Sequence, residues 1–388
     1  MFLLSFNIVN AQWQNTTPIS FRNVESIASD GINLFAGTSG WGLLQSSNNG
    51  DTWNSANSGI TNYWENEFGS IETNGTNIYA AAWDFNFGGG VYLSTNNGSS
   101  WTVMNNGMTS TSAISLGIND SNIFAGTFWG GLFLSTDYGN NWTAINNGLP
   151  TNTIVFSFFV NDTNIFAGTD TGIYLSTNNG ALWTPINNGI TAGNIKSFTK
   201  IGTTIIACGH GGLYKSTNNG SNWIDISNGI SNFEVTSLTT FDSTLFVGNL
   251  DGVYLSSDTG GTWTDVSNGL PIQKSISSLA VCGPYVFLGD SEGVWRRPIS
   301  EMVSIKENHD FLNLNIFPNP SNGKFKITNT NNIKNIEIQN ILGKVIYCST
   351  LNNFQTTTEI DLSTVSKGIY FVKLDNGEQI MTEKIIIN

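Results

Sequence analysis

The sequence predicts an all-β chain of two domains, a seven-bladed β-propeller over residues 12–300 followed by a small Ig-like β-sandwich over 312–388. Three observations predict it. One eight-residue pattern recurs six times at a spacing of about 40 residues, apolar runs are short and separated by Asn/Gly turns, and composition changes near residue 300. Four short strands in about 40 residues is the period of a propeller blade. Helical repeats of similar length are excluded because no segment has apolar residues at i, i+3 and i+4.

The recurring octet reads Ser-x-Asx-x-Gly-x-x-Trp, and its closing tryptophans are 48, 41, 41, 40 and 40 residues apart. The Asx side chain is expected to bond to backbone two residues on, and the glycine permits positive φ. Two strands around such a turn form a β-hairpin, which the tryptophan is expected to cover as it joins the core. The Asx and Trp positions are Asn48, Asn96, Asp137, Asn178, Asn218 and Asp258, and Trp53, Trp101, Trp142, Trp183, Trp223 and Trp263.

Each unit divides into four predicted strands, which in one unit cover 153–159, 164–168, 172–176 and 183–186. Complete units begin near Val24, Glu67, Ala113, Thr153, Asn194 and Glu234. A seventh unit begins near Ser275 but lacks the octet and a fourth strand. Residues 12–16 have the Trp-containing pattern of a fourth strand. They are therefore predicted to pair with the last unit and close the ring, which leaves no open sheet end.

The octet resembles the Asp-box, or bacterial neuraminidase repeat, a motif found in sialidase-like folds. The resemblance implies a β-propeller in which the box is a structural turn at the periphery, away from the ligand face. It implies little about function, because one fold carries many activities. The chain also looks like the single-propeller photosystem assembly factors.

Strand order divides the loops of each unit between two faces. The octets share one face with the turns between strands one and two, and ligand sites in propellers usually lie on the other. Units 1 to 3 are rich in aromatic residues on that second face, and aromatic rings beside carboxylates suit sugar rings. We therefore predict a glycan- or protein-binding patch. The alternative is that the rings pack together to order long loops. The patch comprises Trp41, Tyr63, Trp64, Trp83, Asp84, Phe85, Phe87, Phe128 and Trp129.

Catalysis is not predicted, and no catalytic residue is assigned. A sialidase requires three arginines from separate blades, whereas this domain has only Arg22, Arg296 and Arg297. The last two are adjacent in a predicted strand, so they point to opposite faces and no clamp can form.

The alternative function is a secreted glycoside hydrolase. It would use two of the carboxylates Glu65, Glu67 and Asp84 as acid and base or nucleophile. A simpler interpretation of these three residues is that they are solvated loop charges.

Charge and composition limit the classes of partner and locate the domain boundary. The formal net charge is −13, of which residues 1–300 hold −12, and all twelve tryptophans lie at or before Trp295. These shifts predict a domain boundary near 300 and a linker over 301–311. An acidic surface argues against nucleic acid and anionic membranes, and no apolar run reaches the length of a membrane span.

No metal site or cofactor is predicted. The only histidines are His210 and His309, and the three cysteines are far apart. Cys208, Cys282 and Cys348 are expected to be buried free thiols.

The two ends of the chain predict export. Residues 1–11 resemble the end of a secretory signal peptide, with Val9 and Ala11 at a small-residue cleavage site. The basic segment that should precede it is missing, which suggests a truncated signal. An ordinary first strand is the alternative.

The C-terminal segments 314–325, 341–345 and 367–374 alternate apolar residues with Asn/Gly turns, which is typical of a β-sandwich of about seven strands. Residues 312–388 resemble the C-terminal sorting domain of the Bacteroidetes type IX secretion system. This resemblance implies recognition by the type IX secretion machinery, export across the outer membrane to the surface or medium, and usually removal of the domain. The alternative is an Ig-like adhesion module.

Overall fold

The structure is a computed structural model, and it separates into two compact units, Met1–Ser304 and Ile305–Asn388. Each unit is described by itself below. The predicted signal segment and most of the predicted linker lie outside the described residues. The described residues are 12–16, 23–61, 63–84, 89–191, 193–271, 275–303, 315–328, 333–340, 344–351, 356–375 and 380–388.

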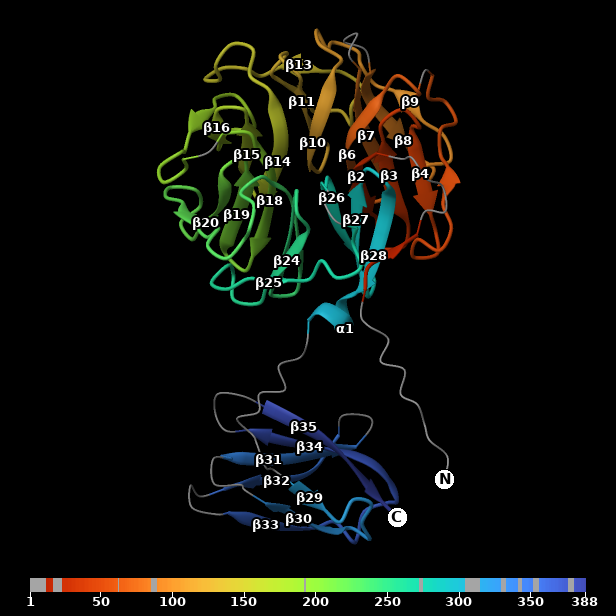
Figure 1. The fold of residues 1–388 in the computed structure, drawn as a ribbon, viewed down its shortest axis with the longest axis vertical. Helices are drawn as coiled ribbons and strands as arrows, with labels where there is room; N and C mark the ends of the chain where they lie inside the picture. The colour runs from red at the N-terminus through yellow and green to blue at the C-terminus, as the bar shows by residue number, and fades with distance from the viewer. Residues whose placement is uncertain are drawn as a thin grey trace. The chain divides into compact units, whose positions relative to one another are not determined.

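The first unit consists of antiparallel sheets arranged around a ring, as the β-propeller prediction requires (Figure 1). Its described residues form seven four-stranded sheets, and in six of them the strands follow one another in chain order. The first three sheets are β2 (Val24–Ser29), β3 (Leu34–Thr38), β4 (Leu43–Ser46) and β5 (Asn54–Ser55); β6 (Glu67–Asn74), β7 (Asn77–Trp83), β8 (Gly89–Ser94) and β9 (Thr102–Val103); β10 (Ala113–Asn119), β11 (Asn122–Thr127), β12 (Leu132–Ser135) and β13 (Thr143–Ala144).

The next three sheets repeat the same order. They are β14 (Val155–Asn161), β15 (Asn164–Thr169), β16 (Gly172–Ser176) and β17 (Thr184–Pro185); β18 (Ile195–Ile201), β19 (Thr204–Gly209), β20 (Gly212–Ser216) and β21 (Ile224–Asp225); β22 (Val235–Phe241), β23 (Thr244–Asn249), β24 (Val253–Ser256) and β25 (Thr264–Asp265). The fourth strands are shorter than the sequence suggested. Only two residues of each pair with the third strand, which leaves the tryptophan just before the strand.

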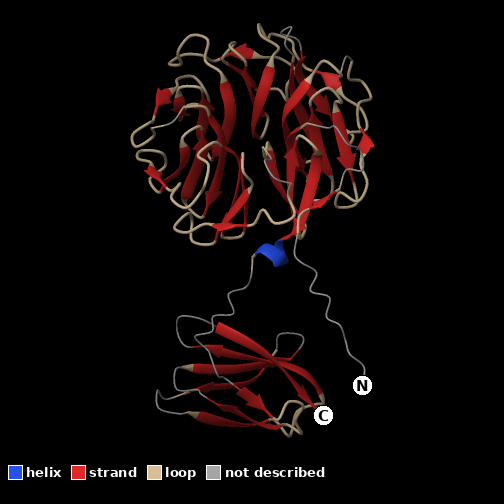
Figure 2. Cartoon of the chain, in the orientation of Figure 1, coloured by secondary structure: helices blue, strands red, loops and turns tan. Residues whose placement is uncertain are grey.

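The last sheet closes the ring with a strand from the N-terminal end, as predicted. It contains β26 (Ser278–Cys282), β27 (Tyr285–Asp290), β28 (Gly293–Pro298) and β1 (Gln14–Asn15). Gln14 pairs with Arg296 and Asn15 with Trp295. The first and last sheets lie side by side in Figure 1 and Figure 2. A short helix, α1 (Ile299–Met302), follows β28 and packs against the core of this sheet.

The octets form tight turns, but their hydrogen bonds differ from the predicted Asx-turn. The Asx Oδ1 accepts the backbone N–H four residues on, at 2.8–3.0 Å, instead of two residues on. The octet serine, which the sequence analysis left without a role, accepts the N–H of the glycine at 2.8–2.9 Å. The glycine and the residue before it both have positive φ, as in hairpin turns of type I′.

The octet tryptophans join neighbouring sheets and do more than cover their own hairpins. Five of them donate the indole N–H to a backbone carbonyl just after the fourth strand of the preceding sheet, at 2.7–2.9 Å. Trp13 takes the corresponding place at the closure, where it donates to Val266 O at 2.8 Å. Trp53 completes the series by donating to Thr16 Oγ1. The tryptophans therefore connect each sheet to the one before it around the whole ring.

A ring of serines forms a second set of connections that the sequence analysis did not find. Every innermost strand contains a serine two residues after a buried apolar residue, and in six of the seven strands the register shifts between these two residues. Six of the seven bond to backbone of an adjacent innermost strand. These bonds connect neighbouring innermost strands to one another around the ring. The serines are Ser26, Ser70, Ser115, Ser157, Ser197, Ser237 and Ser278.

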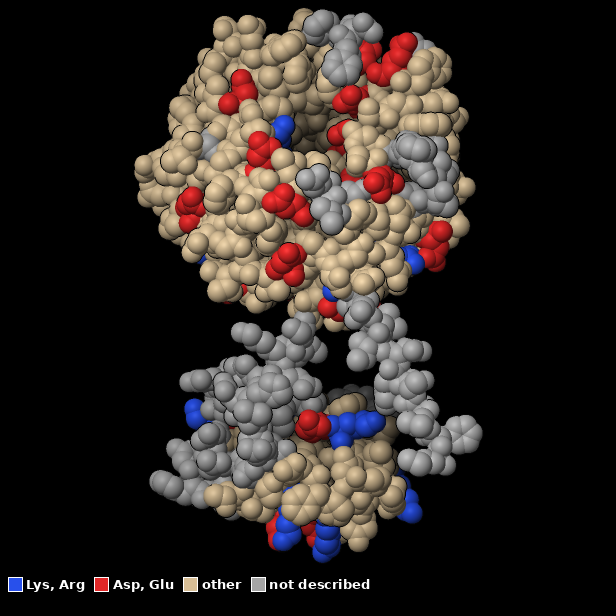
Figure 3. Space-filling view, viewed as in Figure 1, with Lys and Arg blue, Asp and Glu red and all other residues tan. Residues whose placement is uncertain are grey.

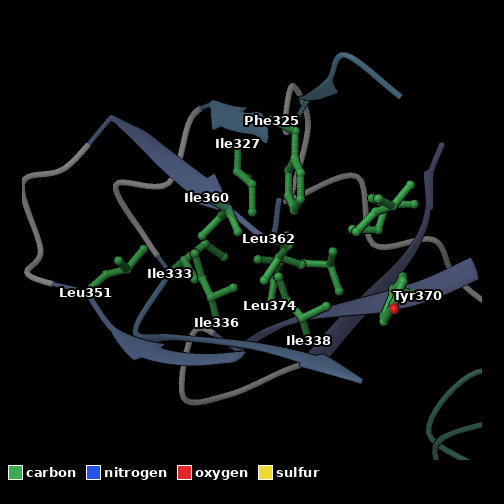
Figure 4. Packing of buried hydrophobic residues seen from close by; sticks show 13 residues of the cluster. Phe325, Ile327, Ile333, Ile336, Ile338, Leu351, Ile360, Leu362, Tyr370 and Leu374 are labelled. Atoms are coloured by element: carbon green, nitrogen blue, oxygen red, sulfur yellow. The ribbon is translucent and has the colours of Figure 1, made fainter. Parts of the chain in front are cut away.

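The second unit consists of two packed sheets with seven strands among its described residues. One contains β29 (Asn315–Phe317), β30 (Lys324–Thr328) and β33 (Thr357–Asp361); the other contains β31 (Asn335–Asn340), β32 (Val345–Thr350), β34 (Gly368–Asp375) and β35 (Ile380–Ile387). Alternating apolar side chains from both sheets meet in one core, whose centre includes Ile327, Ile336 and Ile338 (Figure 4).

The cysteine prediction holds at two of three positions. All three are free thiols, and Cys208 and Cys282 are buried. Cys348 is exposed, because it lies on the outer side of β32. Among the described residues, no helix is both long enough and apolar enough to span a bilayer.

Candidate functional site

Two sets of loops meet at the end of the first unit opposite the octets. The loop between strands two and three of a sheet bonds to the segment that leads into the first strand of that sheet or the next. Examples are Phe128 N–H to Ser112 O at 2.9 Å and Gly40 N–H to Asn66 O at 3.1 Å. These bonds hold the loops against one another around the central hollow visible in Figure 3. The predicted aromatic residues that the structure describes lie on these loops or at the strand end beside them.

Three of the predicted aromatic residues form one continuous stack. The rings of Trp83 and Phe128 are parallel, with centroids 5.3 Å apart and an interplanar angle of 3°. Phe128 in turn contacts Trp129 edge-on at 4.5 Å. Trp83 ends β7 and Phe128 follows β11, so the stack joins two neighbouring sheets. Its outermost ring, Trp129, is 52% exposed.

Trp129 has an unusual backbone conformation. Its φ is +67°, in the left-handed region that bulky residues rarely occupy. Such a conformation costs about 1–3 kcal/mol and is concentrated at functional sites. Only glycine fits at position 130, because a Cβ there would lie 2.3 Å from Cβ of Ser110. The loop therefore presents a large flat ring to solvent at a cost in stability.

A pocket of about 430 Å³ lies beside this ring. It is bounded on one side by Phe128 and Trp129 and on the other by the hydroxyl-bearing segment 109–111. None of its lining residues is charged. They are Thr109, Ser110, Thr111, Phe128, Trp129 and Gly130.

A second aromatic group lies on the first two sheets. Tyr63 and Trp64 contact each other edge-on, with centroids 5.3 Å apart, and Trp64 is 59% exposed. Trp41 is 47% exposed. Gly40, beside Trp41, lies against the backbone of Trp64. Of the nine predicted patch residues, Phe85 and Phe87 lie outside the described residues.

Asn66 and Tyr92 connect the second group to Asp84, and the sequence analysis missed both. Asn66 is buried within an exposed loop. Burial raises the pKa of Tyr92. A hydrogen bond with the Asn66 side chain lowers this pKa, and the negative charge of Asp84 raises it further. Asp84 therefore faces a buried phenol. The sequence does carry a signal for Tyr92, because three later sheets have a tyrosine at the same position of the third strand. These residues, Tyr174, Tyr214 and Tyr254, also direct their hydroxyls to this end.

The carboxylates proposed for the alternative function do not form one group. Glu65 is exposed, whereas Glu67 begins β6 and is half-buried. Burial raises the pKa of Glu67, against a hydrogen bond with Ser39. Its carboxylate neighbour is Glu25, which the sequence analysis did not single out. Burial and then the charge of Glu67 raise the pKa of Glu25, while Asn23 and Lys196 lower it.

Glu25 and Lys196 reach this end because each occupies a β-bulge. The register of β2 shifts between Val24 and Ser26, and that of β18 between Ile195 and Ser197, so the intervening residue has no cross-strand partner. A bulge redirects its side chain. The Lys196 ammonium lies 3.8 Å from the centroid of the Phe156 ring, and Phe156 occupies the same bulge in β14.

The two described arginines of the propeller connect the last sheet, which closes the ring, to its two neighbouring sheets. Arg296 bonds to Asp51 at 2.7 Å on the first sheet, and Arg297 donates to Val266 O at 2.8 Å on the sixth. They therefore point to opposite faces of β28, and neither reaches the aromatic loops. Among the described residues, no group of three or more His, Cys, Asp and Glu could hold a metal ion.

Comparison with known proteins agrees with this architecture. Residues 158–282 match the family model of the DUF6242 β-propeller domain, and residues 315–388 match that of the secretion system C-terminal sorting domain. No curated protein matches the chain in sequence.

Solved structures show the same fold at low sequence identity. YCF48 from Cyanidioschyzon merolae has a TM-score of 0.57 at 14% identity, and the match covers 76% of this chain and 100% of that one. A structure of YCF48 bound to D1 peptide has a TM-score of 0.58 at 14% identity, covering 75% and 97%. The GH74 enzyme of Niastella koreensis has a TM-score of 0.59 at 15% identity, covering 96% and 74%.

These matches identify both units. The seven-strand sandwich is matched over almost its whole length by the sorting-domain family, and that domain directs export by the type IX secretion system. The chain is therefore a β-propeller protein that carries a type IX C-terminal sorting domain and is exported to the cell surface or secreted.

Proposed function

We propose that the propeller is an exported binding module that recognises neutral glycans through the aromatic loops of its first three sheets. The stack of Trp83, Phe128 and Trp129 beside an uncharged, hydroxyl-bearing pocket is the observation that carries this proposal. Exposed indole faces stack on sugar rings, and Thr and Ser hydroxyls can both donate to and accept from sugar hydroxyls. The volume of about 430 Å³ is within the usual range of small-molecule sites.

The uncharged lining supports neutral sugars over acidic ones. A carboxylated, sulfated or phosphorylated sugar would be expected to find Arg or Lys donors, and none lines this pocket. The half-exposed ring of Trp129 at the edge of the pocket is consistent with a binding role.

Replacing Trp129 with Asn is expected to weaken glycan binding at least tenfold, or about 1.4 kcal/mol. Asn tolerates positive φ, so the loop should keep its shape and the melting temperature should not fall. The measurement is binding of the full chain to an array of neutral and acidic glycans, followed by titration of each hit. Phe233→Ala is the matched control, because Phe233 is 53% exposed on the same end of later sheets. Unchanged glycan affinity of Trp129→Asn, or binding to peptides and to no glycan, would overturn the proposal.

A glycoside hydrolase is the second candidate, and the proximity of Glu25 and Glu67 favours it. A carboxyl group whose pKa is raised near an ionisable partner is the pattern of a general acid. The expected result for this function is release of reducing sugar from a bound polysaccharide, abolished by Glu67→Gln and retained by Glu65→Gln. Binding without release of reducing ends at any pH from 4 to 8 would exclude it.

A further inference from the structure

Asparagine followed by glycine occurs twelve times in the sequence, and eleven of these pairs lie among the described residues. Glycine has no side chain to obstruct its own amide nitrogen, so this nitrogen can attack Cγ of the preceding asparagine. A bond forms between the nitrogen and Cγ, the side-chain nitrogen leaves as ammonia, and a succinimide ring remains. Water then opens the ring to aspartate or isoaspartate, so water is the only other reactant. Which pairs can react depends on how the structure holds the two groups.

Six of the eleven pairs have a reacting group in a hydrogen bond. In two of them, the Asn74 amide donates to Asp120 O at 2.8 Å, and the Gly323 N–H donates to Ser321 Oγ at 3.2 Å. The other four lie in octets, where a buried glycine donates its N–H to the octet serine at 2.8–2.9 Å. This bond must break before the nitrogen can attack. The four pairs are Asn49–Gly50, Asn97–Gly98, Asn179–Gly180 and Asn219–Gly220.

The remaining five pairs lie in the turns that lead from one sheet of the propeller to the next. Both residues of each pair are exposed. Within the part of the chain that the structure describes, none of the five glycine N–H groups donates a hydrogen bond. The pairs are Asn106–Gly107, Asn147–Gly148, Asn188–Gly189, Asn228–Gly229 and Asn268–Gly269. Exposure and an unbonded glycine nitrogen are common to all five, so only the asparagine can distinguish them.

Asn188 shows how the asparagine of such a turn is held. Its backbone carbonyl accepts the Trp223 N–H at 2.9 Å, and its side-chain amide donates to Asn222 Oδ1 of the next octet. Gly189 packs so closely that a Cβ there would lie 2.0 Å from Trp223 O. Such an asparagine cannot bring Cγ onto the glycine nitrogen unless these bonds break. The carbonyl bond to a tryptophan N–H recurs at 2.9–3.0 Å in three other turns, those of Asn106, Asn147 and Asn268.

Asn228 is the exception among the five. Neither its carbonyl nor its side-chain amide makes a hydrogen bond to any described residue. A Cβ at Gly229 would lie 3.6 Å from Cδ1 of the Trp263 ring, whereas no backbone atom comes within 4 Å. The acceptor that Asn222 offers to Asn188 is also missing, because the equivalent residue of the next octet is Thr262. The Asn228 side chain is therefore unheld beside an exposed, unbonded nitrogen.

We propose that Asn228 is a site of spontaneous modification, at which the Gly229 nitrogen closes a succinimide that water opens to aspartate or isoaspartate. It reacts faster than the other described pairs because no hydrogen bond has to break first. The product gains a negative charge, and isoaspartate also lengthens the backbone by one atom between residues 228 and 229. The junction should survive this change, because the Trp263 indole donates to Ile226 O at 2.9 Å and not to Asn228.

The test is incubation of the full chain at pH 8, followed by peptide mapping with mass spectrometry and enzymatic methylation of isoaspartate. Asn188 is the matched control, since it is equally exposed and is also followed by Gly-Ile. Conversion of Asn228 is expected to be at least about tenfold faster, because Asn188 must first lose its hydrogen bonds. The rate should rise from pH 6 to pH 9, because the attacking nitrogen must lose its proton. In urea, where the turns unfold, the two residues should convert at similar rates.

Two variants make the outcome decisive. Thr262→Asn restores the acceptor that the preceding octet offers, so it should slow the conversion of Asn228 and leave Asn188 unchanged. Asn228→Gln should remove the reaction from this turn, because the longer side chain would have to close a six-membered ring. Equal rates at Asn228 and Asn188 in the folded chain, earlier conversion of an octet asparagine, or a difference between the two residues that persists in urea would overturn the proposal.

Discussion

Replacing Trp13 with alanine is expected to destabilise the propeller by about 3–5 kcal/mol, the usual cost of truncating a buried tryptophan. Trp13 is 3% exposed, and it holds the closing strand to the sixth sheet through two bonds, from its indole to Val266 O and from its backbone N–H to Asn268 O. Without the indole, β1 should separate from β28 and expose an unpaired strand edge, which promotes association between chains.

The measurement is urea unfolding followed by tryptophan fluorescence. All twelve tryptophans lie in the first unit, so the signal reports the propeller without interference from the sorting domain. Trp41→Ala is the matched control, since Trp41 is 47% exposed and its loss should change stability by less than about 0.5 kcal/mol. Trp183→Ala, at 1% exposure within an internal sheet, should cost as much as Trp13→Ala. If Trp13→Ala behaved like Trp41→Ala, the closing strand would not stabilise the ring.

Removing residues 305–388 is expected to abolish export and leave the propeller folded. The cut after residue 304 keeps α1, whose Ile299 and Met302 are buried in the core of the last sheet, and follows the boundary between the two units. The truncated chain lacks the domain that the secretion machinery recognises, so the protein should accumulate in the periplasm. Cell fractionation with an antibody against the propeller measures the distribution, and tryptophan fluorescence of the retained protein reports its folding.

A point substitution tests whether export requires the folded sorting domain, because it unfolds the domain without deleting it. Ile338 is completely buried in the core of the second unit, so Ile338→Asp should unfold that unit and also block export. Ile369→Asp is the control, because Ile369 is 43% exposed. Fusing 305–388 to a protein normally held in the periplasm should direct that protein outward. Undiminished secretion of the truncated chain would show that the signal lies elsewhere.

The turns were largely predictable because their chemistry is local. Positive φ at an octet glycine depends on the residues within a few positions of it, and the repeat spacing gave the strands between the turns. Even there, a local pattern could not choose between competing acceptors. The Asn48 side chain bonds four residues on instead of two because Ser46 Oγ occupies the interior of the turn and accepts the Gly50 N–H.

The candidate site was less predictable. The aromatic residues could be selected by type, and the alternation of strands placed them at one end of the ring. The stacking of Trp83 on Phe128, in contrast, depends on how two sheets pack side by side. Glu25 is 42 residues from Glu67 and carries no motif of its own, so only the packed ring shows that their carboxyl groups interact.

By itself, the sequence determined the repeat, the turns, the closing strand and the sorting domain, because each depends on residue type at fixed short separations. Only the tertiary structure decided which sheet each tryptophan contacts and how the serines connect the innermost strands. These features join residues about 40 positions or more apart, and their geometry exists only after the ring has closed and brought neighbouring sheets into contact.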